Sequence, residues 1–493
     1  MEFERIPKVL KRYDFGSKMA ICQRNSMEIM STNGLIEVDK LRKKALPWEL
    51  ETFALFSATT LNEYSNFKFA DKKDIRRFYE IISAIREYVH PRLKFAKENN
   101  QFADYFMIVT GLNQFQIQED IYYKIYRYKY LFNFKNANVD MKKQFLKKFG
   151  SEYEEFIKLG FTINFLFANE FVDPNIYLYL LKKYNHVVTR LLIEREAYVS
   201  LQENITRDIT QYLYGFKYFY QFPFISYQQT IYLPLPHLIM HSVTSSLLFR
   251  LTEGNGSLRQ LFGKEVLENY LFHICNLSQD FDEVASDRPY NYKGGERRTL
   301  DIMIRKGEQC FMLDSKSMVP SASLRDLTEK DLEGTLDRLV KSVVQVYRHL
   351  VERFQTEYFP FEENIKFKKE NVFGAVILLE DSFFRREKIM KKAAEVLKIN
   401  IESDEYKYLC SNVKVLGLYE IEKMIFQEEE IFQLLKENQN NKQKWFDYTL
   451  LYGWDNKEKR LIKDINQVVE NIKDVLNEFI DELGEEGLIA KSI

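Results

Sequence analysis

Two aspartates and a lysine stand at a spacing that suits metal-assisted chemistry. Twelve residues separate Asp301 from the tripeptide Asp314-Ser315-Lys316. Both aspartates fall in apolar stretches, TLDIMIRKG and EQCFMLDSKS, whose composition predicts β-strands. A carboxylate inside a buried strand costs free energy unless another group compensates its charge. The two aspartates therefore need a charged partner.

The second stretch places its charged residues on one face. Because side chains alternate along a strand, Asp314 and Lys316 share a face, and Leu313 and Ser315 lie on the other. Two carboxylates on neighbouring strands repel each other unless a divalent cation bridges them, and hard oxygen ligands with few histidines suit Mg²⁺ or Mn²⁺ rather than zinc. Such a metal polarises a phosphate and activates water, while a nearby lysine orients that water or neutralises developing charge. The pattern favours phosphodiester hydrolysis.

Helices and strands in a definite order are expected around these residues. An amphipathic helix is predicted over residues 258–276, followed by three strand-like stretches that turns containing KGGE and KGE separate. Apolar residues at helical spacing predict a long helix over 332–354. Two further strands are predicted at 373–379 and 413–419. The predicted order is α, β, β, β, α, β, with a final β.

This order, together with the D-x₁₂-DxK spacing, resembles the PD-(D/E)xK nuclease superfamily, whose core has α-β-β-β-α-β order and an acidic strand followed by [DE]-x-K. The resemblance covers roughly residues 258–420. It implies an α/β restriction-endonuclease-like core, here joined to a large all-α N-terminal region and a C-terminal helix. It also implies a Mg²⁺- or Mn²⁺-dependent endonuclease.

The resemblance assigns roles to single residues. It implies that Asp301 and Asp314 are catalytic metal ligands and that Lys316 positions the attacking water or stabilises charge. The helix LFGKEVLENYLFHICN is similar to the family's first core helix, which often supplies a glutamate. Glu268 is therefore implied as a further catalytic metal ligand, with Glu265 as its rival.

Five further side chains are expected to surround this centre. The resemblance implies that Gln345, in the second core helix, supports the catalytic residues. Arg297 and Arg298 precede the first aspartate, and Arg385 and Arg386 follow a predicted strand. These arginines either bind nucleic-acid phosphates or balance charge on a solvated face. A net charge of −1 and a pI near 6.7 exclude a global attraction to nucleic acid, so affinity must come from local patches.

The 493 residues are too many for one compact domain. Residues 1–252 predict a mainly helical region that senses a trigger or binds a partner, and the turn-forming run TEGNGS separates it from a nuclease domain at 258–430. A helical segment is expected at 445–493. Its apolar residues, spaced four and three apart, are typical of a short coiled coil or of a helix packed on its own domain: Leu461, Ile465, Val468, Ile472, Val475 and Phe479. A protein partner or a second copy of the chain is thus expected through the N-terminal region or this helix.

Cysteine usage and the N-terminus predict a cytoplasmic protein. The four cysteines form no CxxC pair, and the first residues lack a secretory signal. Residues 218–249 carry no Asp, Glu, Lys or Arg, but three prolines and many polar residues argue against a membrane span and favour a buried junction. No P-loop, GxGxxG or GxSxG sequence occurs, so an ATP-driven motor would have to come from a partner.

Two other motifs have alternative interpretations. His237 and His241 are spaced for a metal on one helical face, but no third ligand accompanies them, which favours a structural role. The run YYKIYRYKYLFNFK, residues 122–135, suits either base stacking or a helix with a tyrosine-rich core face, and the helix is favoured.

The expected function is hydrolysis of nucleic acid, with DNA ahead of RNA because the resemblance is strongest to restriction-like enzymes. A helical region fused to a nuclease core is similar to effectors of antiviral defence against phage. One alternative is a catalytically inactive scaffold that keeps the nuclease fold and binds nucleic acid or protein partners. Another treats Asp314 and Lys316 as a structural ion pair.

Overall fold

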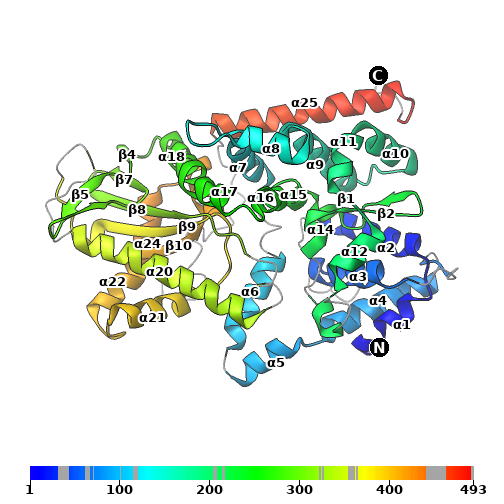
Figure 1. The fold of residues 1–493 in the computed structure, drawn as a ribbon, viewed down its shortest axis with the longest axis horizontal. Helices are drawn as coiled ribbons and strands as arrows, with labels where there is room; N and C mark the ends of the chain where they lie inside the picture. The colour runs from blue at the N-terminus through cyan, green and yellow to red at the C-terminus, as the bar shows by residue number, and fades with distance from the viewer. Residues whose placement is uncertain are drawn as a thin grey trace.

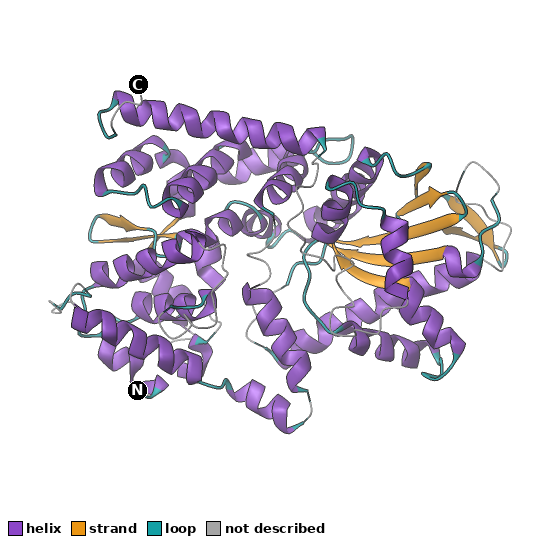
Figure 2. Cartoon of the chain, turned by 180° about the vertical axis from the view of Figure 1, so that it is seen from behind, coloured by secondary structure: helices purple, strands orange, loops and turns teal. Residues whose placement is uncertain are grey.

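The computed structural model describes residues 1–31, 44–61, 67–69, 72–99, 101–114, 120–203, 208–213, 217–320, 324, 327–353, 361, 365–439 and 462–489. The chain is mostly helical, and an α/β part built on a five-stranded sheet lies at one end of the molecule, on the left in Figure 1. Figure 2 shows from behind that the other end consists mainly of helices.

The N-terminal region contains fifteen of the labelled α-helices: α1 (Ile6–Leu10), α2 (Phe15–Ser31), α3 (Pro47–Thr59), α4 (Lys72–Glu87), α5 (Pro91–Glu98), α6 (Phe102–Gln114), α7 (Ile121–Asn133), α8 (Met141–Phe149), α9 (Tyr153–Ala168), α10 (Pro174–Lys183), α11 (Asn185–Leu191), α12 (Arg195–Leu201), α14 (Lys217–Gln221), α15 (Ile239–Ser242) and α16 (Ser245–Thr252). Residues 218–249 form short elements that are mostly buried, although residues 228–230 are exposed, and among the described residues no helix is long and apolar enough to cross a membrane.

The expectation of an all-α N-terminal region is wrong in one detail, because a three-stranded sheet lies within it. Strand β1 (Leu192–Glu194) pairs in parallel with β2 (Phe224–Tyr227), which pairs with β3 (Thr230–Tyr232) in a hairpin. Gln228 and Gln229 form the two-residue turn with φ of 47° and 63°. Positive φ at both turn positions matches the twist of paired strands, and glutamine gives no sequence signal for it.

The α/β part follows α17 (Gly256–Leu261). Its remaining elements are a π-helical segment (Phe262–Leu267), α18 (Glu268–Leu277), β4 (Glu283–Ser286), β5 (Pro289–Tyr292), β6 (Gly295–Arg298), β7 (Ile302–Lys306), β8 (Gln309–Lys316), α20 (Glu329–Arg353), β9 (Val372–Leu378), α21 (Arg386–Leu397), α22 (Asp404–Asn412), β10 (Val413–Gly417), α23 (Leu418–Phe426) and α24 (Ile431–Gln439). The predicted succession of elements is present, with β5 and β6 inserted as a separate hairpin. The last strand ends at Gly417 because Leu418 already begins α23.

The main sheet has the order β10-β9-β8-β7-β4, in which β10, β9 and β8 are parallel and β7 and β4 are antiparallel to their neighbours. Alternating side chains of β8 enter two cores: Cys310 and Met312 lie in the core that includes α20, and Phe311 and Leu313 lie in the core that includes α18. Gly374 allows α20 to lie close over β9, since a Cβ there would be 2.5 Å from side chains of α20. The sheet is therefore covered on both faces.

The N-terminal region and the α/β part, the two halves of the molecule, share a hydrophobic core. The core that contains Phe311 and Leu313 also contains Phe132 of α7, Phe145 of α8 and Phe156 of α9. The turn-rich run at 252–257 thus marks a change of architecture within a continuous interior. It lies between α16 and α17.

The C-terminal helix α25 (Lys463–Glu485) packs on its own chain. Figure 1 shows it lying along α7 to α11, and Val468 and Ile472 pack with Ile125 of α7 and Phe161 of α9. Ile465 and Phe479 belong to the hydrophobic core that also contains Phe132 of α7. Of the two interpretations of the apolar spacing, the intramolecular one is confirmed for these residues, whereas Leu461 lies outside the described residues.

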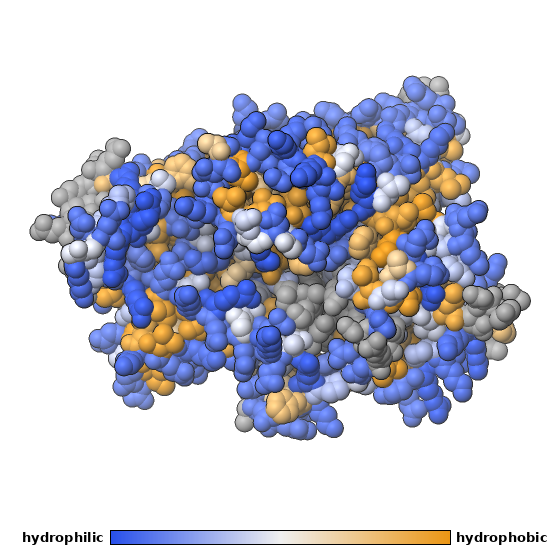
Figure 3. Space-filling view, viewed as in Figure 1, coloured by the Kyte–Doolittle hydropathy of each residue, from blue (hydrophilic) through white to orange (hydrophobic). Residues whose placement is uncertain are grey.

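The surface is hydrophilic over most of the face seen in Figure 3, with local hydrophobic areas. One of these areas lies over α21 and α22, where Val396 and Ile401 are each 56% exposed. Single exposed hydrophobic residues are common on folded proteins and require no partner.

Candidate active site

The ends of β7 and β8 bring Asp301, Asp314 and Lys316 together. Asp314 lies in β8 with 1% of its surface exposed, and its Oδ2 is 2.6 Å from Lys316 Nζ. Asp301 directly precedes β7 rather than lying within it, which corrects the sequence expectation. Alternation along β8 places Asp314 and Lys316 on the same face, as predicted.

Ser315 has a role that the sequence did not suggest. Its backbone N–H donates to Asp301 Oδ2 at 2.6 Å, and its hydroxyl donates to the same oxygen at 2.8 Å. Ser315 was expected only to point away from the charged face. Because Asp301 lies outside the regular ladder, its carboxylate reaches across to Ser315. These two hydrogen bonds fix the Asp301 carboxylate beside the β8 end.

Helix α20 contributes two residues to the same place. Gln345 Nε2 donates to Asp314 Oδ1 at 3.4 Å, so the supporting residue implied by the resemblance does contact the buried aspartate. His349 follows one turn later and contacts Tyr290 of β5, with 3.4 Å between its Nδ1 and the tyrosine hydroxyl. Burial lowers the pKa of His349, and the nearby charges of Glu352 and Asp301 oppose this. The four-residue spacing from Gln345 was the only sequence signal for His349.

Glu268 begins α18, which packs on the face of the sheet opposite α20, and it follows an irregular helical segment. The segment Phe262–Leu267 is π-helical and ends directly before Glu268, the first residue of α18. Gly263 in that segment lies close to the end of β8, since a Cβ there would be 3.1 Å from the Ser317 hydroxyl. Single π-helical turns inside α-helices are common at functional sites, because the wide turn redirects the following side chain.

The two candidate glutamates lie in different surroundings. The charge of Asp301 acts on Glu268, while Glu265 Oε2 accepts a hydrogen bond of 2.9 Å from Asn136. Of the two glutamates, Glu268 is the one whose pKa responds to the charge of Asp301, and Glu265 joins the π-helical segment to the loop after α7.

All three carboxyl groups are held where ionisation is unfavourable. Burial, followed by the charges of Asp301 and Asp287, raises the pKa of Glu268 to about 8. Burial also raises the pKa of Asp314 to about 6, although Lys316 opposes the shift. The pKa of Asp301 is raised by burial against the two hydrogen bonds from Ser315. A bound cation would favour the charged forms of these acids.

The donor chemistry of this cluster fits a hard divalent cation. Hard oxygen ligands suit Mg²⁺ or Mn²⁺. Within the part of the chain that the structure describes, no group of three or more His, Cys, Asp or Glu side chains is arranged to hold a metal ion. Mg²⁺ commonly uses one or two carboxylates and completes its shell with water and substrate phosphates. Asp301 and Asp314 would hold it in that manner, with Glu268 as the further candidate.

The four arginines fall into two groups. Arg297 and Arg298 lie on the exposed hairpin strand β6, where Arg297 pairs with Glu352 at 2.7 Å and Arg298 pairs with Asp287. Arg385 pairs with Asp104 of α6 at 3.2 Å. Arg386 is 4% exposed and pairs with Asp381 at 2.6 Å. Arg297 and Arg298 on the hairpin are exposed and accessible to a nucleic-acid strand, whereas Arg386 is buried.

The two histidines of the N-terminal half occupy structural positions. His237 lies 2.7 Å from the Ser26 hydroxyl and 3.2 Å from Glu51, and its side chain is 1% exposed. His241 contacts the Ser245 hydroxyl at 3.1 Å. The tyrosine-rich run forms α7, where Tyr123 and Tyr128 are buried. The structural interpretations of both motifs are therefore favoured.

The fold and this cluster define a mostly helical protein with an α/β part that gathers buried carboxylates and a lysine. Comparisons with known proteins add no relative, because no family model, curated protein or solved structure matches the chain.

Proposed function

We propose that this protein is a metal-dependent nuclease of the PD-(D/E)xK type. The observation that carries the proposal is the Asp314–Lys316 pair at the end of β8, next to Asp301 and within reach of the Glu268 charge. The succession α18, β4, β7, β8, α20 and β9 supports a restriction-endonuclease-like core, with β5 and β6 as an insertion. Buried carboxyl groups with raised pKa values in one place are typical of functional sites.

The residues of this cluster have distinct tasks in hydrolysis. When bound, Mg²⁺ or Mn²⁺ supplies a Lewis acid for the scissile phosphate and lowers the pKa of coordinated water. Lys316 places a positive charge where the phosphate gains negative charge, or it orients the attacking water. Gln345 fixes the Asp314 carboxylate, and Ser315 fixes that of Asp301.

DNA is the proposed substrate ahead of RNA, and antiviral defence is the proposed setting. Arg297 and Arg298 on the β5–β6 hairpin are 48% and 60% exposed, so their guanidinium groups are accessible to phosphates. Glu268 is among the charges that act on Arg298, which supports assigning this arginine to the same region as Glu268. The net charge of −1 gives the chain no overall attraction to a polyanion, so affinity for nucleic acid has to come from local positive charge such as these two arginines.

The direct test is cleavage of plasmid DNA, single-stranded DNA and RNA by the purified chain with Mg²⁺, with Mn²⁺ and with EDTA. We expect cleavage of DNA with either metal and none with EDTA. Cleavage that persists in EDTA would contradict the metal-dependent mechanism. An inactive scaffold is the alternative, favoured by the lack of a three-ligand group among the described residues. It predicts metal-independent DNA binding that an Asp314→Ala substitution leaves unchanged.

The pKa of Glu268 predicts how stability depends on pH. Its value of about 8 in the folded protein, against 4.5 for an ordinary glutamate, means that the unfolded chain releases this proton first as pH rises. The stability that Glu268 contributes is complete below about pH 4.5 and is lost as pH rises through about 8. In EDTA, the melting temperature of the wild type should therefore fall relative to Glu268→Gln over this interval.

The matched control is Glu265→Gln, which changes a glutamate in the same helical segment that bonds Asn136 instead. Between about pH 4.5 and 8, the melting temperature of Glu265→Gln should change with pH in the same way as that of the wild type. With Mn²⁺ present, stabilisation of the wild type should grow with pH, because the metal binds the charged carboxylates. If the melting temperatures of the wild type and of Glu268→Gln changed with pH in the same way, the raised pKa of Glu268 would be contradicted.

A further inference from the structure

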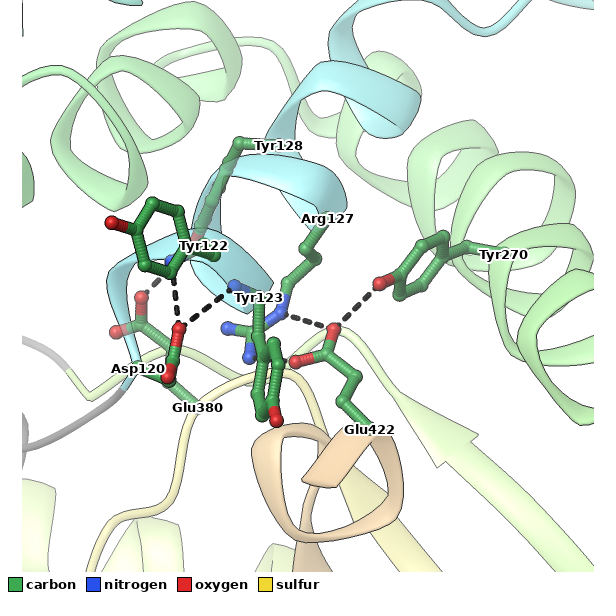
Figure 4. A network of polar contacts seen from close by, with 8 residues as sticks. All are labelled: Asp120, Tyr122, Tyr123, Arg127, Tyr128, Tyr270, Glu380 and Glu422. Atoms are coloured by element: carbon green, nitrogen blue, oxygen red, sulfur yellow. Dashed lines mark hydrogen bonds and ion pairs between the residues drawn. The ribbon is translucent and has the colours of Figure 1, made fainter. Parts of the chain in front are cut away.

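A fully buried ion pair joins α7 to the α/β part. Arg127 of α7 donates from Nε to Glu422 Oε1 at 2.7 Å and from Nη2 to Oε2 at 2.5 Å, and both side chains are 0% exposed. Tyr270 of α18 donates to the same Glu422 Oε1 at 2.6 Å. Figure 4 shows Arg127 and Tyr270 converging on Glu422 from two different helices. The three residues connect α7, α18 and α23.

This network anchors the helix that carries Glu268. Tyr270 follows Glu268 by two residues on α18, so the two side chains leave the helix on nearly opposite sides. Tyr270 points toward Glu422, and the charge of Asp301 acts on Glu268 on the other side. The Tyr270 hydrogen bond therefore fixes the rotation of α18 about its axis, and with it the direction of Glu268.

The next residue of α7 is linked to the end of β8 through the segment that follows β9. Tyr128 donates to the buried carboxylate of Glu380 at 3.1 Å. The backbone N–H of Glu380 donates to Met318, and that of Leu379 donates to Lys316, at 3.1 Å and 3.0 Å. The segment after β9 is thus tied to the end of β8, so α7 is linked to α18 through Glu422 and to the end of β8 through Glu380.

We propose that α7 is a positioning helix for the candidate active site: Arg127 holds α18 through Glu422, and Tyr128 holds the segment after β9 that pairs with the end of β8, so that α7 sets where Glu268 lies relative to Asp301 and Lys316. The inference rests on the proposed nuclease function. A buried ion pair adds little net stability compared with apolar residues of similar volume, whereas its bidentate geometry specifies position strongly. Side chains that support metal ligands commonly change metal affinity or activity by about 10- to 100-fold when removed.

The test compares three variants of the full chain with the wild type. Tyr270→Phe and Tyr128→Phe each remove one hydroxyl and keep the ring. The triple variant Arg127→Met/Glu422→Leu/Tyr270→Phe replaces the whole network by apolar groups, which leaves no buried charge behind. The control is Tyr179→Phe, which removes a comparable tyrosine–glutamate hydrogen bond of 3.0 Å between α10 and α25.

Two readouts are measured for each protein: steady-state cleavage of single-stranded and plasmid DNA, and binding of Mn²⁺ alone by calorimetry. We expect Tyr270→Phe and the triple variant to lose about 10- to 100-fold in kcat and in Mn²⁺ affinity, with KM for DNA little changed. Tyr128→Phe should lower kcat with a smaller change in Mn²⁺ affinity. The Tyr179→Phe control should match the wild type, and melting curves establish that each variant is folded.

The outcomes separate the inference from the proposed function. Wild-type cleavage with unchanged kcat and Mn²⁺ affinity in the network variants would overturn the positioning role and leave the nuclease intact. If the triple variant melts early, the two single tyrosine variants decide, and wild-type behaviour in both overturns the inference. A wild-type chain that neither cleaves nor binds Mn²⁺ overturns both.

Discussion

Asp314→Asn is expected to lower the rate of DNA cleavage by roughly 100-fold or more, because the substitution removes a carboxylate charge from the proposed metal site. The amide keeps the shape of the side chain and the contact with Gln345. Burial already raises the pKa of Asp314 to about 6, so removing its charge also removes a desolvation penalty. The variant should therefore be inactive and remain folded. Cleavage rates and melting temperatures at pH 7.5 in the same buffer measure both effects.

Lys316→Met provides the complementary variant and a test of the structural interpretation. It should also lower cleavage strongly, because Lys316 Nζ is 2.6 Å from Asp314 and lies at the proposed site of hydrolysis. Asp404→Asn on α22 is the control, since this carboxylate is 93% exposed and pairs with Lys407, one turn further along the same helix. If the Asp314–Lys316 pair were merely structural, both substitutions would lower the melting temperature and leave the cleavage rate of the folded fraction unchanged.

Strand β8, which carries Asp314 and Lys316, was predictable because its pattern is local. Alternation along β8 determines that Asp314 and Lys316 share a face, and the apolar residues beside them determine that this face is buried. Helix α20 was equally clear, since its apolar spacing extends over many turns. From these two elements follows the contact between Gln345 and Asp314.

The remaining parts of the site depend on features with no local signal. The bonds from Ser315 to Asp301 arise because Asp301 lies just outside β7, and strand boundaries are poorly determined by sequence. The π-helical segment before Glu268 looks like an ordinary amphipathic helix in the sequence. Arg127 and Glu422 are 295 positions apart, so no spacing could have paired them. Tertiary packing determines these contacts and irregular segments, so the local sequence pattern could not predict them.

Arg127→Met alone is expected to reduce the free energy of unfolding by about 3–5 kcal/mol. The substitution removes the positive charge of Arg127 from the fully buried carboxylate of Glu422, to which the Tyr270 hydroxyl also donates. A buried carboxylate whose counter-charge has been removed bears its full desolvation cost. Urea denaturation at neutral pH, followed by tryptophan fluorescence and by circular dichroism, measures the loss.

Adding Glu422→Leu to Arg127→Met should restore most of that stability, although it removes a second native residue. Apolar replacement of a whole buried ion pair is often neutral or stabilising, because neither charge then needs solvation. The restored stability should come without restored cleavage, since the geometry of α18 relative to α7 would no longer be specified by the bidentate contact. A double variant as unstable as Arg127→Met would mean that packing around α7, rather than the charge of Glu422, is the source of the loss. A single variant as stable as the wild type would mean that water or another group compensates Glu422, and that the ion pair does not constrain the junction between the two halves of the chain.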